Sequence, residues 1–220
     1  MKKMKSVPLN DELYNYIIDK FVPEDPVLEE LIKETKESGF PMIQIAPEQG
    51  KFLYLICKMV NAKSALEIGT LTGFSGIFIA RGLRDDGKLT TVDINPDHSE
   101  LAKKYFKKAG VENKINTVVD EGLSFMKSAI ESSIKYDLIF IDAEKINYPN
   151  YFELAFNLSH EGTILAFDNT LKHGNVVDDP GDDENLRAIQ KTNNLMATDN
   201  RVESLLLPIG DGITFGVVKI

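Results

Sequence analysis

The chain has 220 residues, 43% of them apolar, so it is long enough to build one sizeable core, and no linker divides it. Its formal net charge of −9 disfavours nucleic acid as a partner, because an acidic surface repels phosphate backbones. The single cysteine, Cys57, has apolar neighbours that indicate core packing. No apolar run has membrane-spanning length, and the basic start of the chain lacks the apolar region of a signal peptide, so we expect a cytoplasmic protein.

The first 60 residues predict helices. Apolar residues recur at helical spacing in 10–21, and two prolines follow that segment. A second helix is expected to end near Ser38, before a glycine, and a third to span 47–60. We expect these helices to pack on a cofactor-binding sheet formed by 61–220, within a single domain of 1–220.

From residue 64 onward, short apolar strands alternate with helices. Five strands are predicted, at 64–69, 89–94, 115–119, 136–142 and 162–168. The helices between them are predicted at 73–83, 96–110, 122–132 and 148–158. Strands this apolar, each followed by a helix, are typical of a parallel sheet that helices cover on both faces.

The C-terminal part has a different pattern. Segments 202–209 and 213–220 predict two strands, and the tight link Gly210-Asp211-Gly212 favours a hairpin between them. The last strand should therefore run antiparallel. The acidic run 178–184 does not have the spacing of a calcium-binding loop, so we interpret it as a solvated loop that leads into a helix. The expected fold is α/β, a Rossmann-like, mostly parallel sheet of seven strands.

The end of the first predicted strand has features of a nucleoside site. Gly69 and Gly73 follow Glu67, but their spacing is not that of a dinucleotide-binding turn, which places a helix N-terminus on a pyrophosphate. S-adenosylmethionine has no phosphate and carries a cationic sulfonium and an ammonium group, which an acidic residue such as Glu67 suits. Asp93, at the end of the second strand, is placed to accept hydrogen bonds from ribose hydroxyls. Ordinary loop chemistry is the alternative for each residue alone; together they favour a nucleoside.

The fourth and fifth strands end in oxygen ligands. Asp142 closes one, and Asp168 with Asn169 closes the other. The carboxyl ends of parallel strands meet at one edge of a sheet, where ligands bind. Two carboxylates and an amide suit an octahedral cation such as Mg²⁺ and leave positions for the two oxygens of a vicinal diol.

Lys145 follows Asp142 by three residues. A nearby cation and sulfonium would disfavour its ammonium form, and a neutral lysine could act as general base toward a hydroxyl. Taken alone, the aspartate is more typical of a helix cap and the lysine of a solvated side chain. The set of Asp142, Lys145, Asp168 and Asn169 favours a catalytic function.

The chain resembles the cation-dependent catechol and caffeoyl-CoA O-methyltransferases over nearly its whole length. The matching segments are Ile45-Ala46-Pro47-Glu48-Gln49-Gly50, Leu66 to Ser75, Phe140 to Lys145, Asp168-Asn169 and Leu207 to Gly212. The resemblance implies a seven-stranded sheet with an antiparallel last strand, S-adenosylmethionine as methyl donor, a phenolic or catechol acceptor and a homodimer. It also implies Mg²⁺, or another divalent cation such as Mn²⁺ or Ca²⁺.

The same resemblance assigns residues to roles. Asp142, Asp168 and Asn169 would hold the metal, and Lys145 would take the hydroxyl proton. The cofactor pocket would be lined by Ile45, Glu67, Gly69, Ser75, Asp93, Asp142 and the main chain near Gly122.

The sequence departs from the family pattern at both ends of the site. Asp120-Glu121-Gly122 replaces a Gly-x-Ala pattern beside the adenine, and Lys172 stands where the family often has tryptophan. The Lys172-His173 pair suits either an anionic substrate or a solvated loop, and we do not expect His173 to bind the metal. Methylation of nitrogen and a non-catalytic cofactor-binding role are the alternative functions. The first is disfavoured because Asp142-Ala143-Glu144-Lys145 lacks the Pro-Pro-aromatic motif that holds a planar amine.

Overall fold

The computed structural model describes residues 7–219, so the basic start of the chain and Ile220 lie outside the described residues. The helices are α1 (Asp11–Phe21), α2 (Pro26–Glu37), α3 (Pro47–Met59), α4 (Phe74–Gly82), α5 (Pro96–Lys108), α6 (Gly122–Glu131), α7 (Tyr148–Asn157) and α8 (Glu184–Thr198). The strands are β1 (Ser64–Ile68), β2 (Lys88–Asp93), β3 (Ile115–Val119), β4 (Tyr136–Ile141), β5 (Ser159–Phe167), β6 (Val202–Leu207) and β7 (Ile213–Val218). Three short 3₁₀ helices complete the list: η1 (Glu112–Lys114), η2 (Lys145–Asn147) and η3 (Lys172–Val177).

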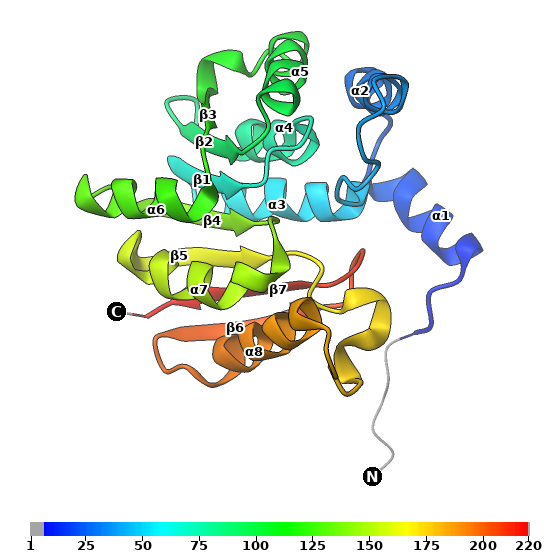
Figure 1. Cartoon of the computed structure of the whole chain (residues 1–220). Coiled ribbons are helices and arrows are strands. Elements are labelled where there is room, and N and C mark those ends of the chain that lie inside the picture. The colour runs from blue at the N-terminus through cyan, green and yellow to red at the C-terminus, as the bar shows by residue number, and fades with distance from the viewer. Residues whose placement is uncertain (1–6, 220) are drawn as a thin grey trace.

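The strands form one seven-stranded sheet in the order β3-β2-β1-β4-β5-β7-β6 (Figure 1). Pairs from β3 to β5 are parallel, whereas β7 is antiparallel to both β5 and β6. The predicted sheet and its antiparallel last strand are confirmed. The strand order reverses direction between β1 and β4, and this is the position at which open α/β sheets bind ligands.

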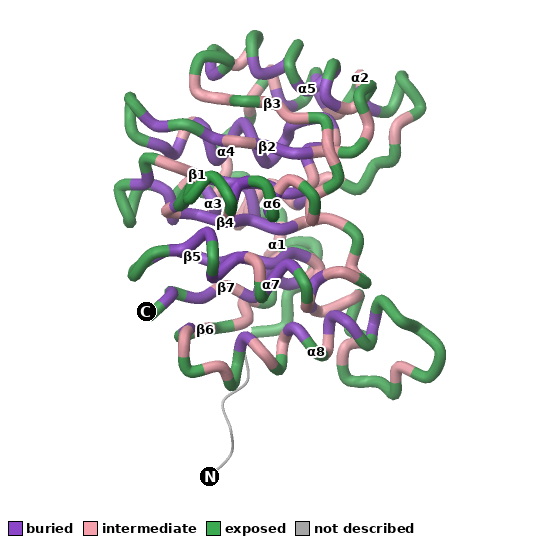
Figure 2. Tube along the Cα trace, turned by 60° about the vertical axis from the view of Figure 1, so that its left-hand side comes forward, coloured by how far each residue is buried: buried purple, intermediate pink, exposed green. Residues whose placement is uncertain are grey.

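Side chains of each central strand alternate between two cores. Leu138 and Phe140 of β4 pack toward α3, α4 and α5, whereas Ile139 and Ile141 pack toward α6, α7 and α8. All four are completely buried, and most of β1 and β4 is buried as well (Figure 2). Burial on both faces explains why these strands have nearly continuous apolar sequences.

The N-terminal helices add a layer beside this sheet. Asp25 caps α2 through the N–H groups of Val27 and Leu28 and forms an ion pair with Arg81 of α4. In contrast, α1 has no buried residue and projects from the body of the molecule (Figure 1). Helix α3 packs on α4, and its first turn lies near the carboxyl ends of the parallel strands.

The fifth strand starts earlier than predicted, at Ser159 rather than Gly162. Gly162 has a left-handed φ of +89°, and the β4–β5 register shifts between Tyr136 and Leu138, so an irregular segment precedes the regular pairing. The glycine signal therefore marked an irregularity inside the strand rather than its start. Within residues 7–219, no helix combines the length and apolar character needed to cross a membrane.

Candidate active site

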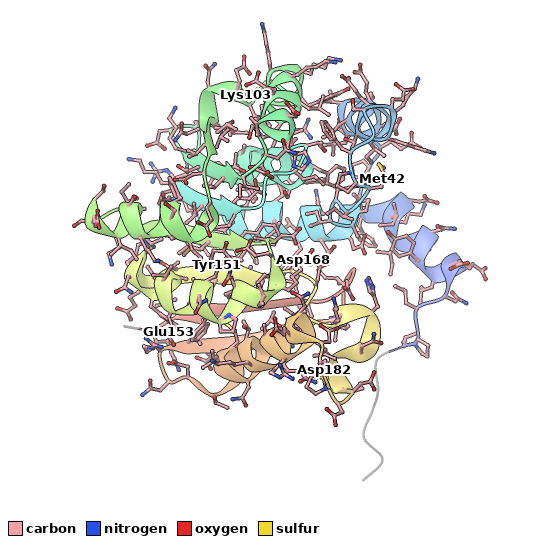
Figure 3. The ribbon with its side chains drawn as sticks, in the orientation of Figure 1. Met42, Lys103, Tyr151, Glu153, Asp168 and Asp182 are labelled. Carbon is pink, nitrogen blue, oxygen red and sulfur yellow. The ribbon has the colours of Figure 1, made fainter. Side chains whose placement is uncertain are left out.

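A cleft of about 1130 Å³ opens at the carboxyl ends of the parallel strands. Its walls come from the α2–α3 connection and from the segments that follow β1, β2, β3, β4 and β5. In Figure 3, Asp168 and Met42 both lie toward this end of the molecule, on the side of α1. Most predicted site residues line the cleft: Ile45, Gly69, Asp93, Gly122, Asp142, Lys145, Asp168 and Asn169.

A close backbone contact with Asp142 requires glycine at position 69. The φ of Gly69 is +101°, and a Cβ added there would lie 2.0 Å from the carbonyl oxygen of Asp142. The turn after β1 and the end of β4 therefore touch through backbone atoms, and only glycine permits this. The contact fixes the turn after β1 relative to Asp142.

Asp93 is held by main-chain donors on both sides. Leu71 N–H donates to its Oδ2 at 2.7 Å and Asn95 N–H to its Oδ1 at 2.8 Å. His98 Nδ1 lies 3.3 Å from Oδ1. Oδ2 accepts one of these hydrogen bonds and keeps a further lone pair, so a pre-oriented acceptor remains available in the cleft.

Glu67 and Ser75 lie beneath the turn rather than at the wall of the cleft. Glu67 is completely buried, and Thr91 Oγ1 donates to its Oε2 at 2.6 Å. Burial raises the pKa of Glu67 to about 7, although the hydroxyl bond opposes the shift, and the charges of Asp142 and Asp93 raise it further. Within residues 7–219, its Oε1 is a buried acceptor without a partner. A cation in the cleft would favour the ionised carboxylate.

Gly122 begins α6, and a Cβ there would lie 2.5 Å from Tyr151 Oη. Tyr151 in turn donates to Glu144 at 2.7 Å, which links α7 to the segment after β4. Asp120 and Glu121 line the cleft beside Gly122, so the departure from the family pattern adds two carboxylates at this end. Ile45, from the α2–α3 connection, is buried opposite.

Asp142 and Asp168 are adjacent carboxylates at the ends of β4 and β5. Asp168 is 1% exposed, and burial, with the neighbouring charge of Asp142, raises its pKa to about 7. No group of three or more histidine, cysteine, aspartate or glutamate side chains suited to a metal occurs in residues 7–219. The candidate ligand set in the cleft has only two carboxylates, those of Asp142 and Asp168, together with the Asn169 amide. Its oxygen chemistry and unbalanced negative charge fit a hard divalent cation.

Lys145 is fixed by two hydrogen bonds. Its Nζ lies 2.8 Å from Asp142 Oδ1 and 2.8 Å from Tyr148 Oη. Tyr148 is completely buried, and burial together with the charges of Asp142 and Asp168 raises its pKa well above the usual value. The phenol therefore stays protonated and donates toward the carbonyl oxygens of Asp168 (3.0 Å) and Ile141 (3.3 Å). Tyr148 thus joins the lysine to the main chain of both strand ends.

Gln49 is a second residue that the sequence interpretation did not assign to the site. It is 2% exposed, and its Nε2 donates to Asp168 Oδ1 at 2.5 Å. It belongs to the segment 45–50 on which the family resemblance rests, and this was the only sequence signal that pointed to it.

The loop after Asn169 has an unusual backbone. Asn169, Lys172 and His173 have φ values of +55°, +50° and +55°, a region that side chains other than glycine rarely adopt. The turn between β6 and β7 supports it, since Leu171 N–H donates to the carbonyl of Asp211 and His173 N–H to its carboxylate. Lys172 and His173 line the cleft, while His173 is largely exposed and paired with Asp211. That Lys172 and His173 suit an anionic methyl acceptor remains a prediction.

Comparisons with known proteins assign this chain to a protein family. The model of the family described as O-methyltransferase matches residues 19–219. Caffeoyl-CoA O-methyltransferase 2 of Petunia hybrida is 36% identical, over 96% of this chain and 91% of the relative. Catechol O-methyltransferase of Niastella koreensis is 31% identical, over 96% of this chain and all of the relative. The structure of a Bacillus cereus O-methyltransferase in complex with SAH superimposes with a TM-score of 0.86, at 33% identity over 93% and 96% of the two chains.

The chain therefore belongs to the O-methyltransferase family, in the group of the caffeoyl-CoA and catechol O-methyltransferases. The predicted family and enzyme class are confirmed. The match favours oxygen over nitrogen as the atom methylated and an enzyme over a non-catalytic binding protein. The individual site residues are not tested by these comparisons.

Proposed function

We propose that this protein transfers the methyl group of S-adenosylmethionine to one hydroxyl of a catechol-like small molecule, and that the transfer depends on Mg²⁺ or a similar divalent cation. One observation carries the proposal: Asp142, Asp168, Asn169 and Lys145 line the same cleft as Asp93. A cation site, a general base and a hydrogen-bond acceptor for the ribose hydroxyls would then serve one reaction.

The protein residues have separate roles in this mechanism. The bound cation supplies Lewis acidity that lowers the cost of ionising a hydroxyl, and S-adenosylmethionine supplies an activated methyl group. Asp142, Asp168 and Asn169 would hold the cation at the part of the cleft where Lys145 would meet the acceptor hydroxyl. Lys145 accepts the hydroxyl proton at Nζ, and Tyr148 keeps that nitrogen in place.

The cofactor residues act at the other end of the cleft. Asp93 accepts hydrogen bonds from the ribose hydroxyls, and Ile45 and the main chain at Gly122 flank the adenosyl group. Gly69 keeps the turn close to Asp142, and Ser75 packs below it. Glu67 supplies buried negative charge beneath the turn, which favours a cationic amino acid moiety above it.

A chelation experiment tests the reaction. Catechol and S-adenosylmethionine should yield a product heavier by one methylene unit, read by mass spectrometry. EDTA should abolish turnover and excess Mg²⁺ or Mn²⁺ should restore it, because both ions accept oxygen-rich octahedral sites. Full activity in exhaustively chelated buffer would contradict the proposed cation dependence.

We also propose a homodimer, supported by an apolar surface on α3 and the β6–β7 hairpin. Leu55 and Met59 of α3 are 45% and 74% exposed, and Leu205 and Val217 of the hairpin are 57% and 40% exposed. The two elements are neighbours, because Phe52 and Phe215 pack edge to face with ring centroids 5.2 Å apart. Contiguous exposed apolar side chains of this kind mark association surfaces.

Light scattering tests the dimer. Met59→Glu combined with Leu205→Glu should halve the mass in solution, because each change buries a charge in the interface. Ile134→Glu is the control, since Ile134 is 41% exposed but lies outside this surface. A wild-type protein with the mass of one chain would refute the proposal.

A further inference from the structure

Gln49 joins two segments that are far apart in the sequence. It is the third residue of α3, and its Oε1 accepts the N–H of Ala46 at 2.8 Å. Its Nε2 donates to Asp168 Oδ1 at 2.5 Å across 119 residues. The orientation of the amide follows from these partners, because a main-chain N–H can only donate and an ionised carboxylate can only accept.

The β6–β7 turn closes over the same side chain. Gly210 has a φ of +52°, and a Cβ added there would lie 2.3 Å from Gln49 Cδ and Oε1. Two carbons cannot approach so closely, so Gly210 leaves the space that the Gln49 amide fills. Gly212, two residues on, packs in the same way on Leu171 of the loop that follows Asn169. The turn therefore contacts both the residue that binds Asp168 and the loop that continues from it.

We infer that Gln49 is a positioning residue that sets the orientation of the Asp168 carboxylate for a divalent cation, and that Gly210 holds Gln49 in the required conformation. The inference rests on the proposed cation dependence. Residues that hydrogen-bond a metal ligand restrict its rotation and typically contribute a factor of about 10–100 to metal affinity.

A neutral amide suits this role better than a charged donor. A lysine or arginine in the place of Gln49 would compensate the negative charge of Asp168 and compete with the cation for it. The amide fixes one carboxylate oxygen while leaving the charge of the carboxylate available. Asp142 differs, because Lys145, which contacts its Oδ1, is needed near the acceptor as the proposed base.

Calorimetric titration with Mn²⁺ tests the inference. Gln49→Met keeps the length and roughly the volume of the side chain but removes the amide, that is, the donor to Asp168 and the acceptor for Ala46 N–H, so Mn²⁺ affinity should fall by about 10–100-fold. Affinity for S-adenosylmethionine, measured in the same way without metal, should change by less than about threefold, because Gln49 acts on the cofactor end through the single hydrogen bond from Ala46 N–H and not by contact with Asp93. A fall in both affinities would indicate general disruption and would overturn the positioning role.

Gly210→Ala perturbs Gln49 without changing it. It should weaken Mn²⁺ binding in the same direction as Gln49→Met. Gly181→Ala is the matched control: Gly181 has a φ of +46°, close to that of Gly210, but no atom lies within 4 Å of the added Cβ. This variant carries the same backbone strain and should bind Mn²⁺ like the wild type.

The outcomes separate the inference from the proposed function. A wild-type protein that binds no Mn²⁺ would refute the cation site itself. A wild type that binds Mn²⁺ together with a folded Gln49→Met that binds it equally well would refute only the inference. Should Gln49→Met fail to fold, the comparison of Gly210→Ala with Gly181→Ala decides, and equal Mn²⁺ affinity in the two would overturn the role of Gln49.

Discussion

The position of Lys145 is set by a short segment that also contains its hydrogen-bond partners Asp142 and Tyr148. The 3₁₀ helix η2 begins at this residue, three positions after Asp142, and α7 follows at once with Tyr148. The spacing i, i+3, i+6 therefore brings Asp142, Lys145 and Tyr148 to one side of a compact turn. The lysine was predicted because Asp142 precedes it closely, whereas Tyr148 was not, because in sequence it is one more aromatic residue at the start of a helix.

Replacing Lys145 by alanine should lower kcat with catechol by at least about a hundredfold, because a general base typically contributes 10²–10⁴-fold. The affinity for S-adenosylmethionine should stay nearly unchanged. A nitrocatechol that is already ionised at neutral pH should be affected much less, since no proton remains to be removed. Steady-state kinetics with both acceptors measures this, and equal loss with both would mean that the lysine only positions substrate.

The polar residues at the strand ends could be predicted from the sequence. The residues that hold them in place by hydrogen bonds could not. Asp142, Asp168 and Asn169 each follow a run of apolar residues, so a local pattern places them at one edge of the sheet. Gln49 meets Asp168 across 119 residues, and no local pattern reports such a contact. Conversely, Glu67 was expected in the cofactor pocket, but strand alternation turns its side chain toward α4, beneath the turn.

At the level of elements, the turns after the parallel strands determine the shape of the cleft. The limits of the strands and helices that these turns join could largely be predicted. Helix and strand limits between residues 10 and 158 agree with the predictions to within about two residues, because capping residues, prolines and glycines mark them. No helix was predicted between Asn169 and the acidic run 178–184, where a solvated loop was one of two interpretations of Lys172-His173, but this segment contains the short helix η3, interrupted at His173. Its conformation depends on hydrogen bonds to Asp211, which the local sequence does not contain.

Gly69→Ala should disturb both ends of the cleft. The added methyl group would meet the Asp142 carbonyl, and the left-handed φ would add strain, so we expect a loss of about 1–3 kcal/mol in unfolding free energy. Affinity for S-adenosylmethionine should also fall, by about tenfold or more. Chemical denaturation and calorimetry provide the two measurements.

Gly162→Ala is the control for that substitution. Gly162 has a φ of +89°, near the +101° of Gly69, but its added Cβ meets no atom within 4 Å. It should show the strain alone and keep wild-type cofactor affinity. Equal cofactor affinity in the two variants would show that the contact with Asp142 does not shape the site.

For the molecule as a whole, the buried carboxyl group of Glu67 links stability to pH. Its pKa is raised to about 7 in the folded state from about 4.5, so the folded protein binds this proton more tightly than the unfolded chain does. The resulting stabilisation is complete below about pH 4.5 and is lost as the pH rises through about 7. At 1.36 kcal/mol per pKa unit, its upper limit is about 3 kcal/mol.

The unfolding free energy of the ligand-free protein should therefore decrease between pH 5 and pH 8, and Glu67→Gln should reduce the decrease. Glutamine has the shape of the protonated acid but does not titrate. Denaturant titrations at several pH values measure both slopes, and their difference isolates Glu67 from Asp168, whose pKa is raised as well. Identical slopes would mean that Glu67 does not titrate in this range.

The hairpin β6–β7 has a consequence for how the protein folds while it is being synthesised. Its turn, Gly210 to Gly212, packs on Gln49 from the first quarter of the chain and on Leu171, and β7 fills the place between β5 and β6. The sheet thus stays open beside β5 until β7 has been synthesised, and the contacts of the turn join segments of high sequence separation, which fold slowly. A chain shortened before β7 would still contain Asp142, Lys145, Asp168 and Asn169, but it would lack the turn that packs on Gln49 and on the loop after Asn169, so it should not turn over substrate.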